Sequence, residues 1–131
     1  MLDIKTTVHK SKIQGDGLFA LEDFKPGEIV VAWDTSNTLT EEQFDRLPDD
    51  QRRYVARYNG GWLYMMGPAR SINHSCDPNC IPLKGNEVAI RDIQAGDEIT
   101  SDYRPVMQTG ARMECRCGAE SCTGFIIGTA L

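Results

Sequence analysis

Apolar residues in this chain occur in short runs that are separated by glycine, proline and polar residues. No apolar run is longer than five residues, the length of the run at residues 29–33. Glycine and proline interrupt regular structure, and the 12 glycines and 6 prolines are spread along the whole sequence. We therefore predict a mostly β protein, built from short strands and turns.

Two segments, residues 20–28 and 89–97, share one pattern. Each runs through an apolar pair, an aspartate, an apolar residue, a glycine and an acidic residue, and then meets a second apolar stretch. Gly27 and Gly96 supply the positive φ of a tight turn, and the β-branched residues that follow suit a pleated strand. The pattern predicts two similar hairpin-like turns, from which we infer no duplication.

Two short helices are predicted in the middle of the chain. Thr40 is an N-cap candidate, acidic and amide side chains fill the first turn after it, and Pro48 limits this helix. A second helix is predicted over residues 49–58, and the glycine pair at 60–61 ends it. From residue 105 onward no apolar period is long enough for a core, so that segment needs another stabiliser.

The composition fits a single globular domain. The chain has 131 residues, of which 40% are hydrophobic and 25% charged. These values are close to the averages for globular proteins, so they exclude disordered, collagen-like and coiled-coil classes as well as a second full domain.

Charge narrows the choice of partner. Lys and Arg number 14 against 19 Asp and Glu, for a net charge of −5. Nucleic-acid binders concentrate basic residues, so we expect a cationic partner and no direct nucleic-acid binding. No apolar signal segment opens the chain and no run approaches the ~20 residues that span a bilayer, so we expect no membrane partner. The expected location is intracellular: cytoplasmic, or nuclear and chromatin-associated in a eukaryote.

Five cysteines indicate a metal site rather than disulfides, because intracellular thiols stay reduced. Three of them, Cys115, Cys117 and Cys122, lie in one short stretch. Structural zinc takes four ligands in a tetrahedron, so the fourth would come from Cys76 or Cys80 and would tie the tail to the middle of the chain. Free buried thiols and redox chemistry are the alternatives.

The polar residues 71–82 predict a structured loop. Its Asn-His-Ser sequence does not indicate a hydrolase triad, since consecutive side chains rarely face one another and the chain has no Gly-x-Ser-x-Gly elbow.

Four segments together resemble the SET-domain protein lysine methyltransferases. They are Gly-Asp-Gly-Leu-Phe-Ala at 15–20, Asn-His-Ser-Cys-Asp-Pro-Asn at 73–79, Gly-Asp-Glu-Ile-Thr-Ser-Asp-Tyr at 96–103, and the Cys-x-Cys-x-x-x-x-Cys-x-Gly motif at 115–124. All four occur in the family's order and cover nearly the whole chain.

The resemblance implies a SET-domain fold of small curved sheets, in which the Asn-His-Ser-Cys and Asp-Tyr segments cross in a pseudoknot-like way. It implies a SET domain at 1–104 with a variable insert at about 38–62, followed by a zinc-binding post-SET segment at 105–131. It also implies S-adenosylmethionine as methyl donor and a protein lysine as acceptor.

Residue roles follow from the same resemblance. Tyr103 matches the family's catalytic tyrosine. Residues matched to donor binding are Gly15, Asp16, Gly17, Leu18, Asn73, His74 and Phe125. Residues matched to the lysine channel are Trp33, Ser101, Tyr103 and Phe125. The zinc ligands implied are Cys76, Cys115, Cys117 and Cys122, which leaves Cys80 as a buried thiol.

Two positions depart from the family pattern. Ser71 stands where an aromatic residue is usual, so part of the channel wall is missing. Ser101 stands where Phe or Tyr often tunes how many methyl groups are added. The number of methyl groups is therefore open.

The predicted activity is methylation of lysine in a histone-like or other basic protein or peptide. Acidic residues of the insert, Glu41, Glu42, Asp45, Asp49 and Asp50, would attract such a partner. The alternatives are a non-catalytic zinc-containing module that binds basic peptides and a zinc redox or metal-trafficking protein. A homodimer is also left open.

Overall fold

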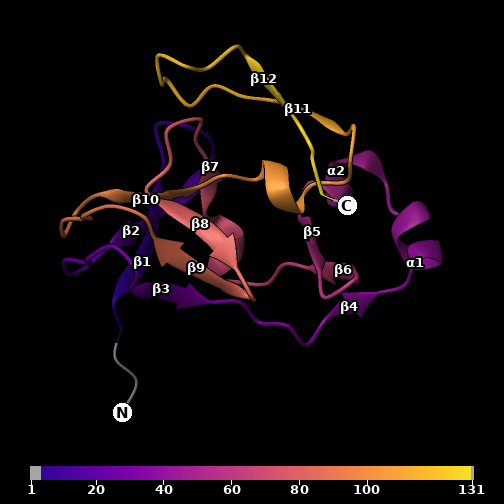
Figure 1. The fold of residues 1–131 in the computed structure, drawn as a ribbon, viewed down its shortest axis with the longest axis horizontal. Coiled ribbons are helices and arrows are strands. Elements are labelled where there is room, and N and C mark those ends of the chain that lie inside the picture. Colours follow the sequence, from indigo (N-terminus) through magenta and orange to yellow (C-terminus); the bar gives the residue numbers. More distant parts are fainter. Residues whose placement is uncertain (1–3, 131) are drawn as a thin grey trace.

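The computed structural model describes residues 4–130, and strands dominate it. Short helical segments interrupt the strands at four places within this range (Figure 1). In chain order the elements are β1 (Thr6–Lys10), β2 (Asp16–Ala20), β3 (Ile29–Ala32), β4 (Thr38–Leu39), α1 (Glu41–Asp45), α2 (Asp49–Arg52), β5 (Val55–Tyr58), β6 (Gly61–Tyr64), η1 (Ala69–Ser71), β7 (Asn73–His74), β8 (Cys80–Leu83), β9 (Asn86–Ala89), β10 (Glu98–Ser101), η2 (Arg104–Val106), β11 (Arg112–Glu114) and β12 (Phe125–Ile127). The mostly β class expected from the sequence is confirmed. The outermost residues of the predicted ranges 1–104 and 105–131 lie outside the described part.

The largest sheet has the strand order β1-β2-β10-β8-β9-β3, with β7 also paired to β10. β10 pairs antiparallel with β2 and parallel with β7 and β8. Strand β10 therefore joins the glycine-rich start of the chain to the Asn-His-Ser-Cys segment. Side chains that are essentially buried, including Leu18, Cys80 and Ile99, form the core beneath it.

The two similar segments do not form hairpins of their own, contrary to the sequence prediction. They pair with each other instead: Phe24 and Ile93 exchange backbone hydrogen bonds of 2.8 and 2.9 Å. The amides of Gly27 and Gly96 each donate to the alanine that opens the other segment, at 2.8 Å. Their φ values, 90° and 95°, have the predicted sign. The shared pattern thus closes one side of the sheet by reciprocal pairing.

The first predicted helix is confirmed and the second is half wrong. α1 begins with a capping box, in which the Thr40 side chain accepts from the Gln43 amide and the Gln43 side chain accepts from the Thr40 amide. α2 ends at Arg52, and the rest of the predicted helix is β5, which forms a hairpin with β6. The turn is Asn59-Gly60, with φ of 53° and 79°, and Asn-Gly is a favoured hairpin turn.

The C-terminal segment, drawn in yellow in Figure 1, runs over the body of the molecule. β11 and β12 pair antiparallel, and a small cluster forms around Met107, Cys115 and Ile126. This cluster is far smaller than the main core, so the expectation of a tail that needs another stabiliser is retained.

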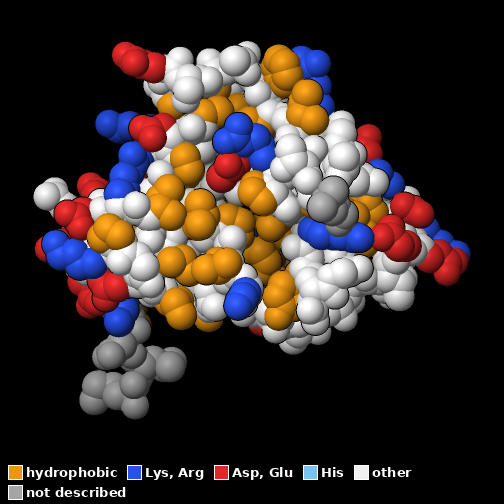
Figure 2. Space-filling view, in the orientation of Figure 1, with side chains coloured by type: hydrophobic (Ala, Val, Ile, Leu, Met, Phe, Trp, Pro, Cys, Tyr) orange, Lys and Arg blue, Asp and Glu red, His pale blue; other side chains and the backbone are white. Residues whose placement is uncertain are grey.

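Hydrophobic side chains also gather on the outer face over β3, β8 and β9, as Figure 2 shows. On these strands, Ile29 of β3 and Leu83 of β8 are 56% and 49% exposed. No helix within residues 4–130 has the length and apolar character needed to cross a membrane.

Candidate functional site

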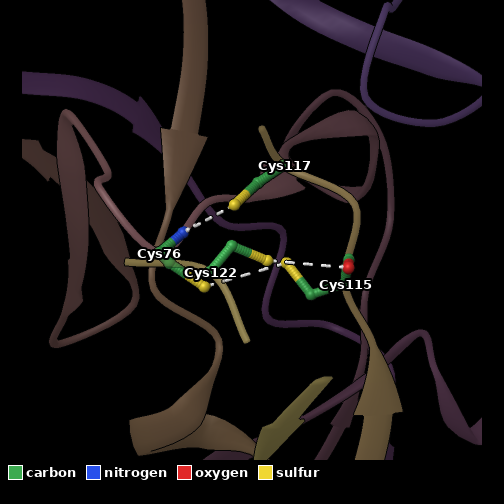
Figure 3. Close-up of side chains that lie close together, drawn as sticks. All are labelled: Cys76, Cys115, Cys117 and Cys122. Carbon is green, nitrogen blue, oxygen red and sulfur yellow. Dashed lines mark hydrogen bonds between the residues drawn. The ribbon is translucent and has the colours of Figure 1, made fainter. Parts of the chain in front are cut away.

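Four cysteines converge where the tail meets the loop after β7 (Figure 3). The Sγ atoms of Cys76, Cys115, Cys117 and Cys122 all lie within 4.8 Å of one another, and the Cys76 and Cys115 sulfurs are 3.8 Å apart. A tetrahedral zinc site with Zn–S bonds of about 2.3 Å needs sulfurs about 3.8 Å apart. The donor set therefore fits one zinc ion.

The backbone supports the same set of thiols. The Cys76 amide donates to the Cys117 sulfur at 3.3 Å, as amides do around metal-bound thiolates. Cys80 lies outside the cluster and is fully buried, so of the two candidates for the fourth ligand only Cys76 joins it. Burial, followed by the nearby charge of Glu87, raises the pKa of Cys80 to about 12. It is a buried thiol, as expected.

Asn73 connects β7 to the loop between β1 and β2. Its side-chain amide donates to the backbone oxygens of Gln14 and Asp16, both at 3.0 Å, and to a carboxylate oxygen of Glu98 at 3.1 Å. Gly15 lies inside this loop with φ of 47°, and a Cβ atom there would meet nothing within 4 Å beyond its chain neighbours. The Gly15 backbone is therefore open to a ligand.

Asn79 fixes the loop after β7 against β10. Its side chain accepts from the Thr100 amide at 2.9 Å and donates to the Glu98 carbonyl at 2.9 Å. With the parallel pairing of β7 and β10, these bonds hold the Asn-His-Ser-Cys and Asp-Tyr segments side by side.

Gly17 does not have a positive φ, so backbone conformation does not require glycine at this position. Close packing requires it instead. A Cβ atom at this position would lie 2.5 Å from a Glu98 carboxylate oxygen and 3.0 Å from the Ser11 Cβ atom. That carboxylate is held by the Ser11 hydroxyl at 2.8 Å and by Asn73, so it is not free to swing away.

We expect Gly17→Ala to lower the free energy of unfolding by about 1–3 kcal/mol, because the added methyl group overpacks this contact. Chemical denaturation measures the change. Gly61→Ala is the matched control, since its Cβ atom would have its nearest neighbour 3.9 Å away, and we expect a change within about 0.5 kcal/mol. Equal stability of the two variants would contradict the packing argument.

His74 lies between the cysteine cluster and Tyr103. The Tyr103 amide donates to His74 Nδ1 at 3.0 Å, which leaves the proton of the neutral ring on Nε2, 3.5 Å from the Cys76 sulfur. Burial lowers the pKa of His74, and the Asp102 carboxylate offsets this only in part. The neutral ring thus ties the zinc-ligand loop to the segment that carries Tyr103.

The Tyr103 hydroxyl donates to the backbone carbonyl of Ile72. Burial, and then the charge of Glu87, raise the pKa of Tyr103, so the hydroxyl stays protonated over the physiological range. This hydrogen bond uses the only proton of the hydroxyl, and it fixes the position of the Tyr103 side chain.

A cavity of about 1090 Å³ adjoins these residues. Predicted donor-binding residues Gly15, Asp16 and Asn73 line it, together with the predicted channel residues Trp33, Ser101 and Tyr103. The other predicted donor-binding residues Gly17, Leu18 and His74 are buried and do not line the cavity. Phe125 lies on β12 with the Arg112 guanidinium 3.9 Å above its ring, and it is Arg112 that lines the cavity.

Glu87 on β9 is among the residues of this cavity that sequence reasoning missed. Trp33 donates its indole N–H to a Glu87 carboxylate oxygen at 2.6 Å. A glutamate in a strand usually occupies the solvent-facing side. The one indication that Glu87 faces inward was Ala89, two residues later on the same face of the strand, which is buried.

Known proteins resemble this chain across most of its length. The human protein named histone-lysine N-methyltransferase 2B is 29% identical over 143 residues, covering 91% of this chain, and a Kluyveromyces lactis protein named histone-lysine N-methyltransferase, H3 lysine-4 specific, is 30% identical, covering 92%. The chain spans only 5% and 14% of the lengths of these two proteins.

A solved Plasmodium falciparum structure, described as a candidate histone methyltransferase, matches with a TM-score of 0.65 at 26% identity, and the match covers 78% of this chain and 95% of that one. The family model for the SET domain matches residues 15–104, which is more than half of the sequence. The chain therefore belongs to the SET-domain family.

Proposed function

We propose that this chain is an S-adenosylmethionine-dependent methyltransferase that methylates the side-chain amine of lysine in a basic protein substrate. The observation that carries the proposal is the single cavity that adjoins both groups of residues: Gly15 and Asn73 on one side, and Trp33, Ser101 and Tyr103 on the other. The donor and the lysine must meet within one enclosed space for in-line transfer.

Donor binding is assigned to the loop at Gly15–Asp16 and to Asn73, with Gly17, Leu18 and His74 as the packed support behind them. The open space at Gly15 lets a ligand approach the main chain closely. When bound, S-adenosylmethionine supplies a methyl group carried on a positively charged sulfur. Phe125 remains a proposed contact to the donor, which it would reach if the tail closes over the cavity.

Tyr103 is the proposed catalytic residue. Its proton is donated to Ile72, so the lone pairs of the phenol oxygen remain to accept an N–H from the lysine amine. Free lysine has a pKa of about 10.4, and burial of the amine beside Trp33 and Ile72 favours its neutral, nucleophilic form. Tyr103 thus orients the amine while its surroundings exclude water.

The zinc ion is assigned to the four-cysteine cluster, in a segment at 105–131 that follows a SET domain ending near residue 104. The ion has a structural role there, since four thiolates leave no open position for chemistry. Its proposed task is to hold the tail, which contributes Met107, Arg112 and Met113 to the cavity wall.

The proposed substrate class is a histone or a histone-like basic protein. Support comes from relatives whose names state histone-lysine methylation and from acidic Asp49 and Asp50 at the cavity edge. Glu41 and Glu42 of the insert already pair with Arg57 and Arg46, so these two carboxylates contribute less to attraction than the sequence suggested.

The test is transfer of tritium from labelled S-adenosylmethionine into core histones added to a cell lysate, at mildly alkaline pH. We expect labelled histone bands whose lysines carry the methyl group by mass spectrometry. Weak donor binding by calorimetry and no label, in protein with full zinc content, would instead support the non-catalytic binding module.

A further inference from the structure

Glu87 is a carboxylate buried in the wall of the cavity. It lies on β9, between Val31 of β3 and Pro82 of β8 in the strand register, and its side chain shares the inward face of the strand with Ala89. Only 4% of the residue is exposed. Buried carboxylates are rare without a partner because desolvation is costly, so this position calls for a physical reason.

Half of the carboxylate lacks a partner. Oε2 accepts the Trp33 indole N–H, but Oε1 has no hydrogen-bond partner among residues 4–130. The Trp33 bond fixes the orientation of the group, since the indole is itself nine-tenths buried. Oε1 is therefore held in the cavity wall, where the Ser101 hydroxyl is the other side-chain donor beside the carboxylate and acceptor capacity is left for a ligand.

Glu87 and Tyr103 line the same cavity. Trp33, Glu87, Ser101 and Tyr103 all line the cavity, and the charge of Glu87 is the second-largest influence on the pKa of Tyr103. Burial raises the pKa of Glu87 itself, while the nearby Ser101 hydroxyl and the Trp33 N–H act in the opposite direction. A ligand that donates N–H groups would satisfy Oε1 and relieve the cost of burial.

We propose that Glu87 Oε1 accepts an N–H from the amine of the target lysine, so that Glu87 is a specificity-determining residue that selects unmethylated lysine. The inference rests on the proposed function. Each added methyl group removes one N–H donor, and a trimethylated ammonium has none. Methyl groups beside Oε1 would also leave the carboxylate unpaired, so the site disfavours substrates that already carry methyl groups.

The first test needs no turnover and uses two cations as probes, n-butylammonium and n-butyltrimethylammonium. The reporter is the Trp33 indole N–H resonance, assigned with Trp33→Phe, because that N–H is bonded to Glu87. We expect butylammonium to shift the resonance at a concentration at least about tenfold lower than its trimethyl analogue needs. Glu87→Gln keeps the shape and an acceptor for Trp33, and we expect it to abolish this preference.

Equal responses to the two cations, or an unchanged preference in Glu87→Gln, would overturn the proposal. So would the absence of any response in the wild-type protein. Because no methyl transfer is measured, these results judge Glu87 even if the chain transfers no methyl group to any histone, an outcome that counts against the proposed function alone.

The second test compares kcat/KM for histone H3 peptides that carry unmethylated or monomethylated lysine. We expect Glu87→Gln to reduce the preference for the unmethylated peptide about tenfold. Glu114→Gln is the matched control, since Glu114 also lines the cavity but its side chain is 88% exposed. An unchanged ratio in Glu87→Gln, or an equal loss in Glu114→Gln, would contradict the proposed selection.

Discussion

Replacing Tyr103 with phenylalanine should lower kcat for methyl transfer about 100-fold or more, while the affinity for S-adenosylmethionine changes little. The substitution removes one hydroxyl and keeps the ring, so the shape of the cavity is preserved. Without the phenol oxygen the lysine amine is no longer aligned, and misplacement of a reacting group by about 1 Å costs roughly that factor. Label transfer into histones measures the rate, and calorimetry measures donor binding.

Stability has to be separated from catalysis in this variant. The change leaves the Ile72 carbonyl without its hydrogen-bond donor, which costs about 1–3 kcal/mol. Tyr64→Phe is the control, since the Tyr64 hydroxyl also donates a hydrogen bond, to Gln51 at 2.6 Å. We expect the control to keep its activity; a Tyr103→Phe protein with activity within twofold of wild type would refute the catalytic assignment.

The cysteine site could be predicted from the sequence because it depends on residue type and spacing. Three thiols at 115, 117 and 122 satisfy three corners of a tetrahedron within one short loop, and the chain holds only two other cysteines. Spacing alone did not choose between Cys76 and Cys80. The resemblance chose Cys76, and the structure places the Cys76 sulfur with the others and leaves Cys80 in the core.

The wrong part of the second helix shows how local turn chemistry overrides periodicity. Tyr54, Val55 and Tyr58 lie at a spacing that suits a helix, but Asn59 and Gly60 adopt the two positive φ values of a tight hairpin turn. β6 then supplies a partner strand for residues 55–58. The Asn-Gly pair was the stronger signal, and it was interpreted only as a helix end.

Pairing between distant segments was the least predictable part of the fold. The similarity of residues 20–28 and 89–97 is visible in the sequence, yet nothing local states that the two segments bond to each other. Their reciprocal bonds, such as those between Phe24 and Ile93, join positions far apart in the chain. Glu87 was missed for the same reason, because its burial depends on strands β3 and β8 on either side.

Loss of one zinc ligand should release the tail and weaken donor binding together. Cys117→Ser removes a thiolate that also accepts the Cys76 amide, at 3.3 Å. Since Met107, Gln108, Ala111, Arg112, Met113 and Glu114 all line the cavity, a released tail opens one wall of it. We expect zinc content well below one ion per chain and an affinity for S-adenosylmethionine at least about tenfold lower.

Hydrogen exchange locates the effect within the molecule. Amides of residues 107–130 should exchange much faster in Cys117→Ser, because the small cluster around Met107, Cys115 and Ile126 is too limited to hold the segment alone. Amides of β2 and β10 should keep their protection, since the main core around Leu18 and Ile99 does not include the tail. A chelator added to the wild-type protein should reproduce this pattern, and added zinc should reverse it.

The fifth cysteine provides the control for these measurements. Cys80→Ala also removes a thiol, but from the main core, so it should lower the overall stability by about 1 kcal/mol or more while zinc content stays at one ion per chain. If Cys117→Ser keeps full zinc and full donor affinity, the four-cysteine assignment fails. If instead Cys117→Ser loses zinc but its tail stays protected and its donor affinity is unchanged, then the tail is held by packing, and the ion has no part in shaping the cavity.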